Sequence, residues 1–254
     1  MVLKRFPGIY LSCLMIWTFF SVLTLSAQSN IEFKDLSFPE LSQNQVNDIA
    51  QDKKGYIWLA TYDGVFKYNG YQIERPFAQN NKGESLPIEP ASYLCYSQDD
   101  HLWIVYFNEA LVDLNLKTNV FIAYKHKDNE IGGLSSNTIN CITKDKSGKL
   151  WIGTNSGIDC FDGQKKKFTH FGKNLPGLES DTVSALAVDN NDNLYIGSGS
   201  KFRGLYYLDK KTMSVSKVFN HLKNDDYYEV NSMTIDNGSN IWCSNQGCTY
   251  MIEP

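Results

Sequence analysis

Five short loops of this sequence carry side chains that could bind a polar, ring-shaped ligand. The loops are Thr-Tyr-Asp-Gly from 61, Tyr-Phe-Asn-Glu-Ala from 106, Thr-Asn-Ser-Gly from 154, Ser-Gly-Ser-Lys-Phe-Arg-Gly from 198 and Ser-Asn-Gln-Gly from 244. Aromatic rings can stack on a sugar, while amide and guanidinium groups can hydrogen-bond to its hydroxyls. The candidate residues are Tyr62, Tyr106, Phe107, Asn108, Asn155, Phe202, Arg203 and Gln246. Each also fits an ordinary solvated loop residue, and the inserted Lys-Phe-Arg makes Phe202 and Arg203 the leading candidates.

The motifs that catalysis or tight metal binding would require are missing from the sequence. It contains no Gly-x-Ser-x-Gly, His-Glu-x-x-His or Cys-x-x-Cys and no glycine-rich phosphate loop. Residues 189–193 begin like a calcium loop, but they lack its glycine and final glutamate and fit a hairpin turn better. The carboxylates of the five loops are Asp63 and Glu109, on different repeats. We therefore expect no metal, no cofactor and no catalysis by this chain.

The first 27 residues have the composition of an export signal. Lys4 and Arg5 precede an uncharged run of 17 residues from Ile9 to Leu25, and Ser26-Ala27-Gln28 follows. This order predicts a signal peptide over residues 1–27, cleaved near Ala27, and hence a periplasmic or secreted protein. The alternative is an uncleaved segment that anchors the chain to the inner membrane, because the run is at the short limit for spanning a bilayer.

Charge and cysteine content narrow the classes of partner. Without its first 27 residues the chain has 22 basic and 28 acidic side chains and a net charge of −6, which disfavours nucleic acid. Five cysteines remain, so at least one is unpaired in an oxidising compartment. They are Cys95, Cys141, Cys160, Cys243 and Cys248. We expect most to be buried as small apolar side chains, while Cys243 and Cys248 flank one turn and could pair across it.

One pattern recurs five times along the chain. Its aromatic residue is separated from the next by 45, 48, 44 and 47 residues. The aromatic residues are Trp58, Trp103, Trp151, Tyr195 and Trp242. Four of them have an aspartate six positions earlier, namely Asp52, Asp145, Asp189 and Asp236. A near-constant period of this length indicates a repeat architecture, in which we expect the aromatic residues to pack in the core.

The pattern of burial predicts how each repeat folds. A run of alternating apolar residues ends at the aspartate, and a tight turn, the aromatic strand, a glycine turn and two further strands follow. Leu150 and Ile152 face one side of their strand and Trp151 and Gly153 the other, so both faces must be covered. Four-stranded sheets that repeat every 46 residues or so, covered on both faces, describe a β-propeller. We predict an all-β propeller of four-stranded antiparallel blades near 41–77, 88–125, 134–171, 178–219 and 227–254.

The repeat also resembles a known family. Residues 134–162, LSSNTINCITKDKSGKLWIGTNSGIDCFD, resemble the repeat of the two-component regulator propeller family in every part, and residues 41–70 are nearly as similar. The second repeat departs most, with Ser97 in place of the aspartate, Val105 in place of a glycine and Ala110 at the turn glycine. The fifth has Cys243-Ser244 where Ile-Gly is expected. The resemblance covers residues 28–254, though unevenly.

The resemblance implies a sensor. In this family the repeats build the periplasmic sensor region of bacterial regulators, commonly hybrid two-component systems, many of which control glycan uptake and degradation. There two propellers precede a β-sandwich, a membrane helix, and kinase, receiver and DNA-binding modules. The resemblance therefore implies an extracytoplasmic ligand-sensing module, an oligosaccharide ligand and a homodimer formed through the full-length sensor.

The number of repeats suggests part of a larger propeller. A seven-blade ring at this period needs about 320 residues, whereas 227 remain after residues 1–27. The family resemblance implies that residues 31–37 form the closing strand of a last blade that is not encoded here. The alternative is a five-blade ring in which residues 31–37 pair beside 248–252.

Two other functions stay open at this stage. In a propeller, the loops between second and third strands share one face, which we call the loop face. A secreted propeller enzyme acting on polysaccharide would need convergent acid and base groups on this face. A scaffold for protein–protein contact would use the same loops without binding a small ligand. We rank the ligand sensor first and the enzyme last.

Overall fold

The computed structural model describes residues 38–41, 45–97, 99–172, 175–179, 181–199, 204–218, 230–244 and 249–253. The chain divides into a unit that ends at Ser37 and a unit from Phe38 to Pro254, and all described residues belong to the second. The predicted signal peptide over 1–27 and the predicted closing strand 31–37 lie outside these residues. Within the described part, no helix has the length and apolar character needed to span a bilayer.

The second unit is built from five antiparallel sheets, which we call blades 1 to 5 in chain order. Blade 1 contains β1 (Val46–Gln51), β2 (Ile57–Thr61), β3 (Gly64–Tyr68) and β4 (Ile73–Glu74); blade 2 contains β5 (Ala91–Ser97), β6 (His101–Tyr106), β7 (Ala110–Asn115) and β8 (Val120–Tyr124). Blade 3 contains β9 (Ile139–Lys144), β10 (Leu150–Thr154), β11 (Gly157–Asp162) and β12 (Lys167–Phe171); blade 4 contains β13 (Val183–Val188), β14 (Leu194–Ser198), β15 (Gly204–Asp209) and β16 (Ser214–Lys217). Blade 5 contains β17 (Ser232–Ile235), β18 (Ile241–Ser244) and β19 (Thr249–Ile252).

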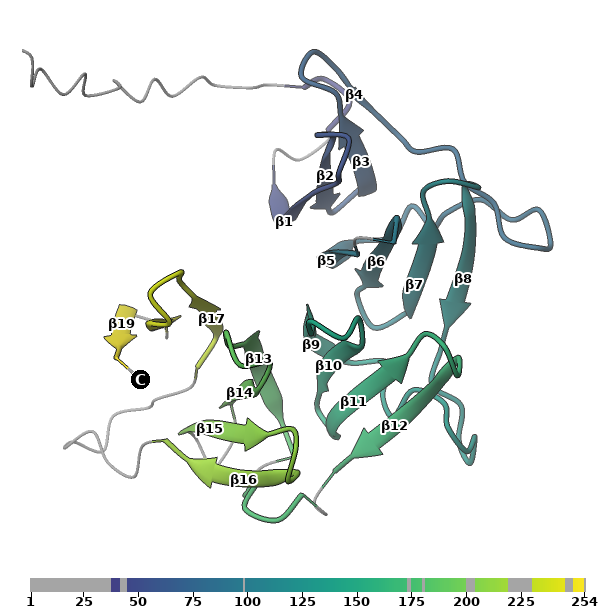
Figure 1. Ribbon diagram of the computed structural model, residues 1–254. Helices are drawn as coiled ribbons and strands as arrows, with labels where there is room; N and C mark the ends of the chain where they lie inside the picture. The colour runs from purple at the N-terminus through teal and green to yellow at the C-terminus, as the bar shows by residue number, and fades with distance from the viewer. Residues whose placement is uncertain are drawn as a thin grey trace, which may run out of the picture. The chain divides into compact units, whose positions relative to one another are not determined.

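The blades form a propeller. The first strands β1, β5, β9, β13 and β17 contact one another in chain order, and Figure 1 shows each of them on the inner side of its blade. Every strand pairs antiparallel with its sequence neighbour, as four-stranded meanders do. The predicted all-β propeller is therefore confirmed, with each sheet inside its predicted range and three described strands in blade 5. The larger seven-blade ring stays a prediction.

The core is divided into apolar layers between neighbouring blades. The layer between blades 1 and 2 includes Trp58 and Tyr106, and the layer between blades 2 and 3 includes Trp103 and Phe161. Trp151 belongs to the layer between blades 3 and 4. Because the second and third strands serve two layers, both of their faces are apolar, which is why strands such as β6, β10 and β11 do not alternate with charged residues.

The recurring aspartate ties the turn after the first strand to the aromatic residue. One carboxylate oxygen accepts bonds from the turn, as when Asp52 accepts from the amides of Lys54 and Tyr56. The other accepts the indole Nε1–H six residues later, at 3.0 Å for Asp52–Trp58 and 2.9 Å for Asp145–Trp151 and Asp236–Trp242. The spacing of six thus gives a buried indole N–H its acceptor.

A β-bulge near the start of the first strand links three of the blades to the next one. The pairing of the first and second strands skips one residue in blades 1 to 4, at positions 47, 92, 140 and 184. Three of these side chains reach the next blade, where Asn47 donates to the carbonyl of Ala91 (2.8 Å), Asn140 to Val183 (3.0 Å) and Ser184 to Val230 (2.6 Å). A bulge re-aims a side chain, and here it aims a donor across the blade boundary.

The outer blades are less buried than the middle ones. Ile49 of β1 is 60% exposed and Trp242 of β18 is 39% exposed, whereas Trp151 is 3% exposed. Residues 38–41 cover part of blade 1, since Phe38 and Leu41 pack with Leu59, Phe66 and Ile73. The recurring aromatic residue is therefore buried in blades 1 to 3, whereas Tyr195 of blade 4 is half-buried and Trp242 of blade 5 is partly open to solvent.

Candidate functional site

The turns between the second and third strands are held by threonine. In blade 3 the Thr154 hydroxyl donates to the carbonyl of Gly157 (3.1 Å) and accepts from the amide of Ser156 (3.0 Å). Thr61 makes the same two bonds in blade 1, to Gly64 (2.9 Å) and from Asp63 (3.1 Å). Both threonines are fully buried, so they fix the turns that present Tyr62 and Asn155.

We expect Thr154→Val to destabilise the protein by about 1–3 kcal/mol, since it leaves a backbone donor and acceptor of this turn without their partner. Urea unfolding measures the change. Thr169→Val on the exposed side of β12 is the matched control and should change the free energy of unfolding by less than about 0.5 kcal/mol. Equal effects of the two changes would contradict this role for the Thr154 hydroxyl.

The linker between blades 1 and 2 brings two turns of the loop face together. Gly64 has a φ of +94°, and a Cβ there would lie 3.1 Å from the carbonyl oxygen of Pro87 and 3.5 Å from Cα of Ile88. At the other end of the linker, the amide of Phe107 donates to the carbonyl of Pro90 at 2.9 Å. The linker therefore runs from the turn of blade 1 to the turn of blade 2.

Three exposed apolar side chains follow this path. Tyr62 is 45% exposed, Ile88 69% and Phe107 64%. We call these three residues the aromatic ridge, after the rings of Tyr62 and Phe107. Most large apolar side chains of this propeller lie in the layers between blades, so three exposed ones along one path mark a surface that can bind a partner. Ile88 was not predicted; its only sequence signal is its place between Pro87 and Pro90.

Amide side chains lie farther along the same face. Asn108 has a φ of +52°, which asparagine tolerates better than most residues, and its side-chain oxygen accepts from the Thr138 hydroxyl at 3.3 Å. Asn140 donates to the side-chain oxygen of Asn155 at 2.9 Å while it also bonds to blade 4. Asn155 is thus positioned by the bulge of its own blade.

The remaining predicted site residues fall elsewhere. Tyr106 is fully buried in the layer between blades 1 and 2, so the expectation that it lies on the exposed loop surface is wrong. It occupies the place of Thr61 and Thr154 at the end of the second strand, where the side chain points inward, and burial raises the pKa of its phenol. Phe202, Arg203 and Gln246 lie outside the described residues.

Titratable groups in the described part of the chain are mostly paired. His101 Nδ1 lies 2.6 Å from Asp113, and His170 Nδ1 lies 2.8 Å from the buried Asp159. On the loop face Glu109 forms an ion pair with Lys125 at 2.7 Å. Among the described residues no group of three metal-ligating side chains comes together.

The described cysteines are free thiols. Cys141, Cys160 and Cys243 are buried and Cys95 is half-buried. Burial raises the pKa of Cys95 and of Cys160 to about 11 and that of Cys141 to about 12, which keeps these thiols protonated and unreactive at neutral pH. Cys248, which could pair with Cys243 across their turn, lies outside the described residues.

Comparison with known proteins points to one family. The model of the two component regulator propeller family matches residues 40–63 and 133–156. A protein described as histidine kinase P4 from Formosa agariphila is 39% identical over 71 residues, which are 27% of this chain and 5% of that protein. The chain therefore spans a small part of this curated relative.

Solved structures show the same relation. The extracellular domain of the putative hybrid two component system BT3049 from B. thetaiotaomicron is 26% identical, with a TM-score of 0.73 over 87% of this chain and 30% of that one. The extracellular domain of BT4673 from the same organism, at 19% identity and a TM-score of 0.64, shares the fold over 87% of this chain and 32% of that one. The two matched repeats coincide with the turns of Thr61 and Thr154 and with the aspartate ties of blades 1 and 3. Blades 1 and 3 thus carry the repeat of the two component regulator propeller family, and the chain is similar over most of its length to the extracellular domain of a putative hybrid two component system.

Proposed function

We propose that this propeller is the extracytoplasmic ligand-sensing part of a hybrid two-component regulator and that its ligand is an oligosaccharide. The location is supported by the similar domain of BT3049, which is described as extracellular. In this proposal the chain is periplasmic or secreted after signal cleavage, and the full-length sensor acts as a homodimer.

The aromatic ridge is the observation that carries the proposal. Tyr62 and Phe107 expose ring surface on the face that also carries the amide groups of Asn108 and Asn155. Rings that stack on the apolar face of a sugar, next to groups that hydrogen-bond its hydroxyls, form the common arrangement of a carbohydrate site. Loops on a rigid scaffold are also where binding residues concentrate.

In this proposal the chain binds the oligosaccharide and does not hydrolyse it. Hydrolysis of a glycosidic bond by the common mechanism uses two carboxyl groups about 5–10 Å apart, one of them poised as an acid. In the described turns between second and third strands, Glu109 is held by Lys125 and Asp63 belongs to a different blade. These two groups do not present the matched acid and base that the chemistry needs.

A glycan array probed with the full-length chain tests the function. We expect a defined set of oligosaccharides to bind, and the variant Tyr62→Ala/Phe107→Ala to weaken that binding by about tenfold or more, because each lost stacking contact is worth about 1 kcal/mol. Tyr71→Ala is the matched control, since Tyr71 is 93% exposed but follows β3 at the opposite end of blade 1.

Three results would contradict the proposal. Absence of binding to every glycan together with self-association of the chain would favour a protein scaffold. Release of shortened sugars from a bound polysaccharide would favour an enzyme. Equal losses in Tyr71→Ala and in the double variant would remove the ridge from the site.

A further inference from the structure

A cleft lies at the boundary of blades 1 and 2, and its lining includes the turns at the ends of the strands opposite the aromatic ridge. Its volume is about 260 Å³, just below the range of pockets that hold drug-sized ligands. It is lined by the turn after β1, by β2 and β3, by the segment that follows β4 and by the turn between β7 and β8. Neither the sequence motifs nor the family match pointed to this cleft.

The cleft exists because β4 ends early. β4 has two residues, whereas the outer strands β8 and β12 have five each. After Glu74 the chain leaves blade 1 and joins the outer strand of blade 2, where the amide of Gln79 donates to Asn119 (3.0 Å) and Phe121 donates to Gln79 (3.1 Å). Residues 75–77 therefore bridge the two blades and form one wall of the cleft.

The lining is positively charged although the chain is acidic. Lys54, Lys67, Arg75 and Lys117 line the cleft together with two carboxylates, Glu74 and Asp100, whereas the whole chain has a net charge of −4. Positive charge gathered in a concave surface of an acidic protein attracts an anionic ligand.

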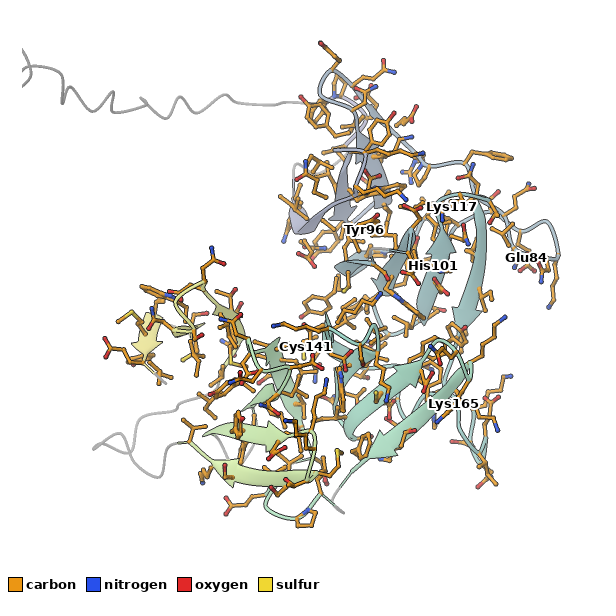
Figure 2. All side chains as sticks on the ribbon, in the orientation of Figure 1. Glu84, Tyr96, His101, Lys117, Cys141 and Lys165 are labelled. Atoms are coloured by element: carbon orange, nitrogen blue, oxygen red, sulfur yellow. The ribbon has the colours of Figure 1, made fainter. Side chains whose placement is uncertain are left out.

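Asp100 is a single carboxylate that pairs with two lysines, so it neutralises only one of their two charges. Its side chain is 6% exposed and binds two lysines at once, Lys53 of blade 1 and Lys117 of blade 2, the latter at 3.2 Å. The bond from Lys53 lowers the pKa of Asp100 to about 2, so this carboxylate stays charged and one lysine charge is left over. Figure 2 shows Lys117 where β7 leads into β8, and its side chain is 64% exposed.

The boundary between blades 3 and 4 provides the contrast. There Lys210 comes from the corresponding turn, but its side chain is 15% exposed and is bound by two carboxylates, Asp145 at 2.6 Å and Asp192 at 2.8 Å. The lysine at that boundary is neutralised by the protein itself. At the boundary of blades 1 and 2, exposed lysines share a single carboxylate and keep donors for a ligand.

Aromatic and acceptor groups in the cleft define the rest of the ligand. Phe77 is 75% exposed and offers a ring face. Tyr56 also lines the cleft, with Lys67 Nζ 4.8 Å from the centre of its ring. The side chain of Asn119 can accept hydrogen bonds from hydroxyl groups, and so can the carboxylate of Glu74, which also pairs with Lys67 at 2.7 Å. A bare phosphate or sulfate would meet the carboxylates without using them, whereas a hydroxylated ring with one anionic group uses every part of the lining.

We propose that the cleft between blades 1 and 2 binds a single acidic sugar ring, with its carboxylate or sulfate against Lys54 and Lys117 and its ring face on Phe77. Arg75 of the lining donates to the carbonyl of Asp63 beside the ridge (2.5 Å), but the residues proposed to hold the sugar differ from those of the ridge, so variants test each site alone.

Matched monosaccharides test the proposal with the full-length chain. Galactose, galacturonate and galactose 6-sulfate differ in the group at carbon 6, and glucose with its two corresponding derivatives controls for ring stereochemistry. We expect saturation-transfer or shift titrations by NMR to show at least one acidic ring binding about tenfold more tightly than its neutral parent, as one charged hydrogen bond provides. The two acidic derivatives distinguish a uronate from a sulfated sugar.

Variants locate the binding. Lys54→Gln/Lys117→Gln should abolish the preference for the acidic ring and leave the neutral ring unchanged. Lys165→Gln is the matched control, because Lys165 lies in the corresponding turn of blade 3 and is 78% exposed. Phe77→Ala should weaken all rings alike, and Phe107→Ala on the ridge should change none. Equal affinity for acidic and neutral rings, or an effect of Lys165→Gln as large as that of the double variant, would overturn the proposal.

Discussion

Asp145→Ala is expected to cost about 3–5 kcal/mol of folding free energy, because it removes one partner of a buried ion pair and hydrogen-bond network. The Asp145 side chain is fully buried and accepts bonds from Trp151 Nε1, the Ser147 hydroxyl and the amide of Lys149, and Lys210 of blade 4 approaches it at 2.6 Å. The change leaves Lys210 with Asp192 alone and the indole N–H without an acceptor. Urea unfolding of the two proteins measures the loss.

Asp236→Ala is the internal control. Asp236 makes the same turn and tryptophan bonds in blade 5, but Trp242 is 39% exposed and water can replace the lost acceptor. We expect a cost of about 1 kcal/mol or less there. If both substitutions cost the same, the buried network of Asp145 is not the source of its effect.

The pH dependence has a definite sign. Burial alone would raise the pKa of Asp145, but the bonds from Lys210, Trp151 and Ser147 outweigh it and hold the pKa below its ordinary value. A group with a lowered pKa stabilises the fold above its unfolded-state pKa, about 3.9, and this contribution is lost as pH falls through the folded-state value. The difference between wild type and Asp145→Ala should therefore be complete at pH 6 and shrink below about pH 4.

Gly153→Ala is expected to destabilise the protein by about 1–3 kcal/mol through overpacking. A Cβ at this position would clash with two side chains at once, because it would lie 2.4 Å from Cys141 Sγ and 2.7 Å from Val183 Cγ1 of the next blade. The first strand of blade 4 comes this close because the inter-blade bond of Asn140 fixes Val183 there. Thermal unfolding followed by circular dichroism reports the change.

Gly163→Ala separates this clash from the general effect of replacing a glycine. Position 163 lies in the turn after β11, and a Cβ there meets only the Phe161 ring at 4.0 Å. We expect a change within about 0.5 kcal/mol. A loss at Gly163 as large as that at Gly153 would contradict the packing argument.

The fold was predictable because its determinants repeat along the chain. The same features recur at near-constant spacing: an aspartate six residues before an aromatic residue, a tight turn between them, and a glycine turn after the aromatic strand. Each reflects a contact within the blade, such as the bond between the aspartate and the indole. The reason for the spacing was not visible in the sequence. It became clear only when the indole N–H and the carboxylate were seen 2.9–3.0 Å apart.

The site was predictable only in part, because it depends on what differs between blades. Sequence placed Tyr62 and Phe107 on loops, and both are exposed there. It could not show that Tyr106 points inward, since a tyrosine had replaced the threonine that ends the second strand elsewhere. The cleft was also hidden, because Lys54 and Lys117 are brought together by a short β4 and a shared blade boundary rather than by any motif.

In the bulge bonds between blades, the donor always precedes the acceptor in the sequence. Asn47, Asn140 and Ser184 each donate to a carbonyl that follows 43 to 46 residues later, never to one that precedes. In blades 1, 3 and 4 the donor is therefore synthesised before its acceptor. Contacts between neighbours of this kind let a repeat protein fold progressively from its N-terminal end. The order in which the blades emerge is then also the order in which they can dock.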